Sequence, residues 1–93
     1  MGKVKSIVEE DLTKCIICGA SPVQLHHTHG GINRKHADEY GLIVPLCLEH
    51  HTGDTGAHHS RALDLYLKRI AQQAFEDLYG HDEYMKIFGK SYL

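Results

Sequence analysis

The clearest pattern of apolar and polar positions lies in the last third of the chain. Apolar side chains recur there every three or four residues, at Leu63, Tyr66, Leu67, Ile70, Ala74, Phe75 and Leu78. This spacing predicts a helix with one apolar stripe, and Ser60 and Gly80 are suitable residues for its two ends. We therefore predict a helix over Ser60–Tyr79, followed by a shorter helix over Asp82–Phe88.

Two short extended segments precede these helices. Val23–His27 and Leu42–Leu46 are bounded by turn-forming residues, and the second is rich in β-branched side chains. Pro45 suits an edge strand, where its missing N–H is not needed. The residues between them, Thr28–Gly41, are predicted to form a loop, so the two segments make an antiparallel hairpin.

The remaining segments are shorter. Residues 1–14 are a mixed-charge lead-in in which Ile7–Leu12 is expected to be partly helical. Cys47–His51 is predicted to begin a short helix that the glycines of Thr52–Gly56 interrupt. Together these elements predict an α+β fold in a single domain over residues 1–93, with a lead-in at 1–14, a core at 15–59 and helices at 60–93.

Length and composition limit the environment of the protein. None of the apolar runs in the 93 residues approaches the roughly 20 that a membrane helix needs, and the N-terminus has no signal-peptide core. Three cysteines cannot all pair within one chain, which argues against a disulfide scaffold. We expect a cytoplasmic protein without a membrane partner. The net charge of −2 is not that of a DNA-coating protein, so any DNA contact must be local.

The cysteines have the spacing of a zinc site. Cys15-x-x-Cys18 and Cys47-x-x-His50 form two knuckles that together offer four sulfur and nitrogen ligands. A structural zinc there would contribute folding energy to a small domain. A redox-active Cys-x-x-Cys and a set of buried free cysteines are the alternatives, while covalent haem attachment would need a histidine where Gly19 stands.

Nine histidines in one short chain require a chemical explanation, and most of them lie between His26 and His59. Neutral imidazole is the commonest metal ligand in proteins and a general base near pH 7. His29 and His36 fall in the predicted loop and are expected to be solvated. His59 and His81 are expected to lie at the surface or to cap helices.

A linked series of motifs resembles the HNH endonucleases, and most closely the small phage-type members of that family. The series comprises Cys15-x-x-Cys18, His26-His27, the loop Gly30-Gly31-Ile32-Asn33-Arg34-Lys35, the strand Leu42–Leu46, and Cys47-x-x-His50-His51. The resemblance covers about residues 15–75. It implies a ββα-metal unit, in which a β-hairpin is followed by a helix.

The resemblance also implies roles for single residues. His27 would be the general base, and His26, His51 and His58 would hold a catalytic divalent ion distinct from the structural zinc. Magnesium or manganese is implied as the working ion, although three imidazoles also suit nickel or zinc. His26 and His27 are neighbours, so on a flat strand they face opposite sides, and only a bulge would relax this limit.

The sequence departs from the family at the asparagine that helps to fix the base. Leu42 occupies its usual place, so Asn33 is our substitute as a catalytic residue, with His36 as second choice. Arg34 and Lys35 are expected either to bind DNA phosphates or to be plain solvated charges. On the long helix, Lys68 and Arg69 would be at most a minor DNA contact.

The expected function is metal-dependent hydrolysis of DNA phosphodiester bonds, in the host cytoplasm if the chain is phage-encoded. Two alternatives stay open. One is a zinc-containing nucleic-acid-binding module without catalysis, which the missing asparagine favours. The other is an adaptor whose long helix docks onto phage or host recombination or packaging proteins. Neither alternative requires the His26-His27 pair.

Overall fold

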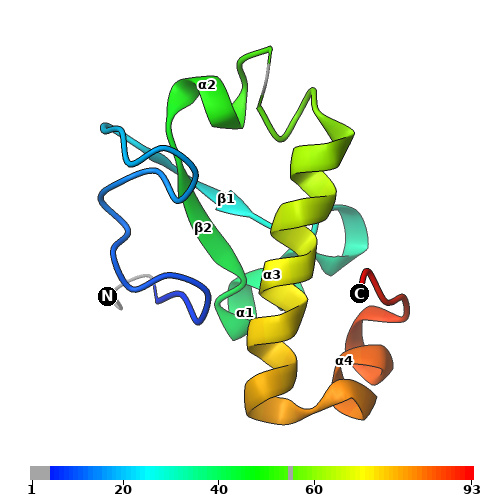
Figure 1. The fold of residues 1–93 in the computed structure, drawn as a ribbon. Helices are drawn as coiled ribbons and strands as arrows, with labels where there is room; N and C mark the ends of the chain where they lie inside the picture. The colour runs from blue at the N-terminus through cyan, green and yellow to red at the C-terminus, as the bar shows by residue number, and fades with distance from the viewer. Residues whose placement is uncertain (1–4, 55) are drawn as a thin grey trace.

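The computed structural model describes residues 5–54 and 56–93. Its elements are β1 (Gln24–His27), the 3₁₀ turn η1 (Gly31–Asn33), α1 (Arg34–Tyr40), β2 (Ile43–Leu46), α2 (Leu48–His51), α3 (Arg61–Tyr79) and α4 (His81–Phe88). Helices pack around a two-stranded antiparallel sheet (Figure 1), so the predicted α+β class is confirmed. No helix in the described part of the chain has the length and hydropathy of a membrane span.

The predicted hairpin is present, with His26 opposite Val44 and His27 opposite Ile43. All four residues of β2 are buried. The N-terminal segment covers the free edge of β2, because the backbone N–H of Ile16 donates to the Pro45 carbonyl at 2.9 Å. The backbone of Pro45 therefore faces away from β1, and its missing N–H removes no bond from the ladder.

The connection between the strands differs from the predicted loop, because residues 31–40 form η1 and α1. Helix α1 is short, but it buries Ala37 completely against the apolar residues of α3 and α4. Gly41 ends the helix with φ +73° and donates its N–H to the carbonyl oxygens of Ala37 and Asp38. Tertiary packing thus stabilises a helix that would be marginal alone.

The helix expected at Ile7–Leu12 was a wrong prediction, because this segment consists of bends and turns. The side-chain oxygen of Ser6 accepts hydrogen bonds from the backbone N–H groups of Val8 and Glu9, at 3.0 and 3.1 Å. Such local bonds compete with a helical backbone. The N–H of Ile7 donates to the Gly41 carbonyl at 3.0 Å, which holds the segment beside the end of α1.

Three predicted helices are confirmed within one residue of their ends: α2, α3 and α4. Ser60 caps α3, since its Oγ accepts the backbone N–H of Leu63 at 3.2 Å. The predicted stripe is only partly buried: Leu67 and Phe75 lie in the core, whereas Tyr66 and Leu78 are exposed. Periodicity located the helix correctly but made its buried face too wide.

Helix α3 contributes to both apolar clusters of the core. Leu67 packs with Val44 and Leu46 of the sheet and with Cys15 and Cys47. About two helical turns further along α3, Phe75 packs with Leu42, which precedes β2, and with Tyr84 and Phe88 of α4. The long helix therefore fixes the hairpin and the start of α2 (Figure 1). These elements carry several of the candidate ligand residues.

Candidate metal centres

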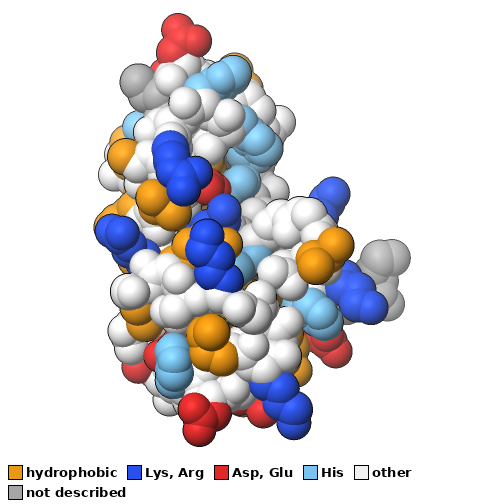
Figure 2. Space-filling view, turned by 90° about the vertical axis from the view of Figure 1, so that its right-hand side faces the viewer, with side chains coloured by type: hydrophobic (Ala, Val, Ile, Leu, Met, Phe, Trp, Pro, Cys, Tyr) orange, Lys and Arg blue, Asp and Glu red, His pale blue; other side chains and the backbone are white. Residues whose placement is uncertain are grey.

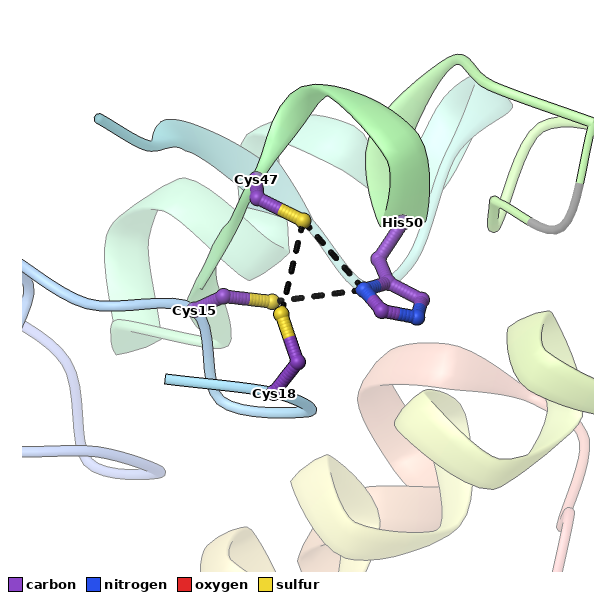
Figure 3. A group of neighbouring side chains, drawn as sticks. All are labelled: Cys15, Cys18, Cys47 and His50. Atoms are coloured by element: carbon purple, nitrogen blue, oxygen red, sulfur yellow. Dashed lines mark hydrogen bonds between the residues drawn. The ribbon is translucent and has the colours of Figure 1, made fainter. Parts of the chain in front are cut away.

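The two predicted knuckles meet in space. Cys15 and Cys18 lie in the turn that precedes β1. Cys47 is the residue immediately before α2, and His50 is the third residue of that helix. The three sulfur atoms and one imidazole nitrogen point toward one another (Figure 3), all within 4.8 Å. The backbone N–H of Cys15 donates to Ala20 at 2.8 Å and that of Gly19 to Cys15 at 2.8 Å, which closes the turn that presents the first pair.

The separations in this group fit one tetrahedral ion. With Zn–S and Zn–N distances of about 2.3 and 2.0 Å, tetrahedral angles put two sulfurs about 3.8 Å apart and a sulfur and a nitrogen about 3.5 Å apart. Cys18 and Cys47 have their Sγ atoms 3.7 Å apart. His50 Nδ1 lies 3.8 Å from the Cys15 sulfur and 3.2 Å from that of Cys47. The four residues could therefore hold a metal ion such as zinc.

The environment of Cys15 favours its thiolate, the form that binds metals. Burial opposes ionisation of this side chain, but the backbone N–H groups of Cys47, Cys18 and Ile17 outweigh it. Together they lower the pKa of the Cys15 thiol from 9.0 to about 6. The thiolate is thus available at neutral pH.

A second group of possible metal ligands consists of His26 of β1, His51 of α2 and His58 of the turn before α3. Their ligand nitrogens lie within 4.8 Å of one another, and His51 Nε2 and His58 Nε2 are 3.1 Å apart. The backbone brings the last two together, because the His58 N–H donates to the His51 carbonyl at 3.2 Å. Gly56, which is buried, permits this turn: a Cβ there would lie 2.8 Å from the His51 carbonyl.

This second group also has the chemistry of a metal site. His26 Nε2 is buried and has no hydrogen-bond partner among the described residues, a costly arrangement that a bound ion would relieve. Burial, with the neighbouring His51 and His58, lowers the pKa of His26 to about 4, so its imidazole is neutral at pH 7. Three converging imidazoles with His58 exposed to solvent match a centre that keeps a coordination position open.

His27 faces the other side of β1 from His26, as the alternation of a strand requires. Its Nε2 lies 3.3 Å from Oδ1 of Asp38 on α1. Asn33, our substitute for the missing asparagine, instead donates its side-chain amide to the Phe88 carbonyl at 3.4 Å. His36, the second choice, lies half-buried near Glu39 and Phe88. Among the described contacts, the side-chain partner of His27 is therefore Asp38.

A hollow of about 460 Å³ lies beside the three histidines of the second group and His27. Both His26 and His27 reach it in spite of their opposite directions, and His51 and His58 form another part of its wall. Two cationic side chains also line it, Arg34 of α1 and Lys68 of α3, together with the carboxylate of Asp64. The histidine-lined hollow thus combines three nitrogens that could bind a metal, one further imidazole and two cations with one carboxylate. Lys35 lies at a neighbouring hollow with His27 and Asp38.

His29 contradicts the expectation that it is solvated. It is 2% exposed, and its Nε2 lies 2.8 Å from the Tyr84 hydroxyl while its Nδ1 lies 2.9 Å from Thr28 Oγ1. It therefore links the end of β1 to α4 as a buried structural residue. His59 and His81 are exposed as predicted, and His81 Nδ1 lies 2.7 Å from Glu76 Oε2.

Two residues near the histidines escaped the sequence analysis. Gln24 places its side-chain oxygen 2.6 Å from His51 Nδ1, and Asp38 contacts His27. Strand alternation could have placed Gln24 on the same face as His26. Asp38 could have been found only by recognising that Arg34–Tyr40 is helical, with Gly41 as its C-terminal signal.

Comparison of the chain with protein-family models, with curated proteins and with solved structures found no match. The interpretation of the site therefore rests on its motifs and its geometry.

Proposed function

We propose that this chain is a metal-dependent endonuclease of the HNH type that hydrolyses DNA phosphodiester bonds. The observation that carries the proposal is the histidine-lined hollow. Three imidazole nitrogens converge on its wall from β1, α2 and the following turn. The imidazole of His27, the next residue of β1, lines the same hollow. A structural metal centre needs no such additional histidine and no open hollow.

In this proposal the two metal groups have different roles. Cys15, Cys18, Cys47 and His50 hold a structural zinc that ties the N-terminal turn to α2. His26, His51 and His58 hold a divalent ion, which would neutralise charge on the scissile phosphate. Magnesium, manganese, nickel and zinc are the candidate ions, and the all-imidazole ligand set favours the softer ones.

The residues of the chain supply the proton chemistry. Asp38 holds His27 through Nε2, which leaves Nδ1 as the nitrogen that accepts a proton from the attacking water. The water oxygen forms a bond to phosphorus as the bond to the sugar oxygen breaks. His27 takes the proton that the attacking water loses, and the leaving sugar oxygen takes a proton from a solvent water. Asp38 then takes the orienting role for which Asn33 was predicted, since its carboxylate accepts the hydrogen bond of the Nε2 N–H and fixes the orientation of the ring.

Cleavage of plasmid DNA by the purified chain tests this function. Supercoiled plasmid and circular single-stranded DNA are incubated with magnesium, manganese, nickel or zinc, and His58→Ala serves as the metal-site variant because His58 is exposed. We expect nicking that depends on the added ion and is weakened in His58→Ala. If neither DNA is cut with any ion while the chain still binds DNA, the function is that of a non-catalytic binding module.

A further inference from the structure

Lys68 reaches the histidine-lined hollow from α3, which lies outside the hairpin and the short helix α2. Its side chain is only 20% exposed, an unusual degree of enclosure for a lysine. Arg69, the next residue, points elsewhere and donates its Nε–H to the Tyr92 carbonyl at 2.9 Å. Of these two neighbouring cations, Lys68 is therefore the one directed to the candidate site.

The ammonium group of Lys68 is held in place by two contacts. Its Nζ donates to Asp64 Oδ2 at 2.9 Å, one helical turn away, and lies 5.1 Å from the centre of the Tyr92 ring. An ion pair of this kind contributes little to stability on a helix surface. It does fix a flexible side chain before a ligand arrives, which reduces the entropy lost on binding.

Lys68 retains binding capacity in this position. An ammonium has three N–H donors, and the hydrogen bonds of the described residues use one of them, to Asp64. Arg34 adds a second cation to the same hollow from α1, with the three metal-binding histidines as a further part of the lining. Figure 2 shows histidine side chains gathered on the upper part of one face with Lys and Arg side chains beside them.

We propose that Lys68 binds a backbone phosphate next to the scissile one, so that a nucleic acid strand passes through the hollow between α1 and α3. This inference rests on the proposed function and adds α3 to the substrate-binding surface. The ligand class is a phosphodiester backbone, because an ammonium carries no information about base sequence. Lys35, at the neighbouring hollow, takes no part in this contact.

Salt-dependent DNA binding tests the inference without relying on cleavage. All variants are made in a His27→Ala parent, and the binding of a labelled duplex is followed by fluorescence anisotropy at several salt concentrations. Lys68→Gln should weaken binding by about threefold to tenfold and lower the slope of log K against log salt by about one. Lys68→Arg should retain most of the parental slope, because it keeps the charge.

The matched control is Lys86→Gln, which removes an exposed lysine from α4, outside the lining of the hollow. It should leave affinity and slope unchanged. Equal affinity and slope for Lys68→Gln and the parent would overturn the inference, as would an equal loss in Lys86→Gln. Metal-dependent cleavage by the wild-type chain alongside an unaffected Lys68→Gln would overturn this contact alone and leave the proposed nuclease intact.

Discussion

The side-chain oxygen of Gln24 on β1 lies 2.6 Å from Nδ1 of His51 on α2. An amide oxygen can only accept, so Nδ1 carries the hydrogen and Nε2 keeps its lone pair. That lone pair faces the group formed with His26 and His58. Gln24 thus fixes the tautomer of His51 that can bind a metal, the relation that outer hydrogen bonds commonly have to metal-ligating histidines.

We therefore predict that Gln24→Leu weakens the binding of nickel or cobalt to the three histidines by about tenfold to a hundredfold. The measurement is calorimetric titration of zinc-loaded protein, in which the cysteine site is already filled. Gln73→Leu is the control, because Gln73 is exposed on α3 and its hydrogen bond among the described residues is to Asp77 of the same helix. Equal affinities for the two variants would show that Gln24 has no influence on the metal.

The cysteine site offers a test that avoids the core. Cys18 is exposed whereas Cys15 and Cys47 are buried, so Cys18→Ser removes a ligand without disturbing packing. We predict that the variant retains less than half of the wild-type zinc and unfolds at a lower temperature, since metal binding here is coupled to folding. Zinc analysis and thermal melts measure both quantities.

Chelation provides the internal control for that experiment. EDTA should lower the melting temperature of the wild type strongly and that of Cys18→Ser much less, because the variant has little zinc to lose. An equal effect of the chelator on both proteins would contradict a structural zinc at the four residues.

The sequence predicted most of the fold where local patterns determine it. The position of α3, its Ser60 cap and the alternation of His26 and His27 are local features, and all were predicted correctly. The sequence-based prediction failed where contacts outside the segment determine the structure. Helix α1 was missed because it is stabilised by the burial of Ala37 against α3 and α4. The helix expected at Ile7–Leu12 is replaced by a turn around Ser6.

The same contrast between local patterns and long-range contacts applies to the candidate site. The knuckles and the histidine triplet were predicted, because ligand spacing and family-like motifs are visible along the chain. The contacts of Asp38 and Gln24 and the orientation of Lys68 depend on how the helices face the sheet, which local spacing does not encode. For Gln24, strand alternation gives only the face of β1 on which it lies. His29 was misjudged for the same reason, since its partner Tyr84 lies 55 residues away.

The buried His29 should make the protein sensitive to acid. Burial, reinforced by Lys68 and opposed by Asp64, lowers its pKa from 6.5 to about 4. The folded state therefore prefers neutral His29, and its contribution to stability is complete above pH 6.5 and is lost as pH falls toward 4. The full loss corresponds to about 3 kcal/mol.

Urea unfolding of the wild type and His29→Leu between pH 7 and 4.5 measures this contribution. The wild type should lose more of its free energy of unfolding across that range than His29→Leu does. The exposed His59→Leu is the control and should follow the wild type. Parallel curves for the wild type and His29→Leu would contradict a neutral, buried His29.

Asp38 should influence catalysis through His27. Asp38→Asn keeps the shape of the side chain but weakens the hydrogen bond to Nε2, because a neutral amide oxygen is a poorer acceptor than a carboxylate. The ring of His27 is then held less firmly, so we predict a fall in kcat of about tenfold or more with little change in KM. Glu39→Gln removes the neighbouring exposed carboxylate of the same helix and should leave kcat unchanged. Equal rates for the two variants would exclude an orienting role for Asp38.

The most direct test of the proposed nuclease compares plasmid nicking by the wild type and His27→Ala in the ion that supports the highest activity. Loss of a general base should slow the reaction about a hundredfold or more, while zinc content and melting temperature stay as in the wild type. That result would establish the activity and its base together. A His27→Ala protein that nicks as fast as the wild type would contradict the mechanism and identify the cleavage as that of another site or a contaminant.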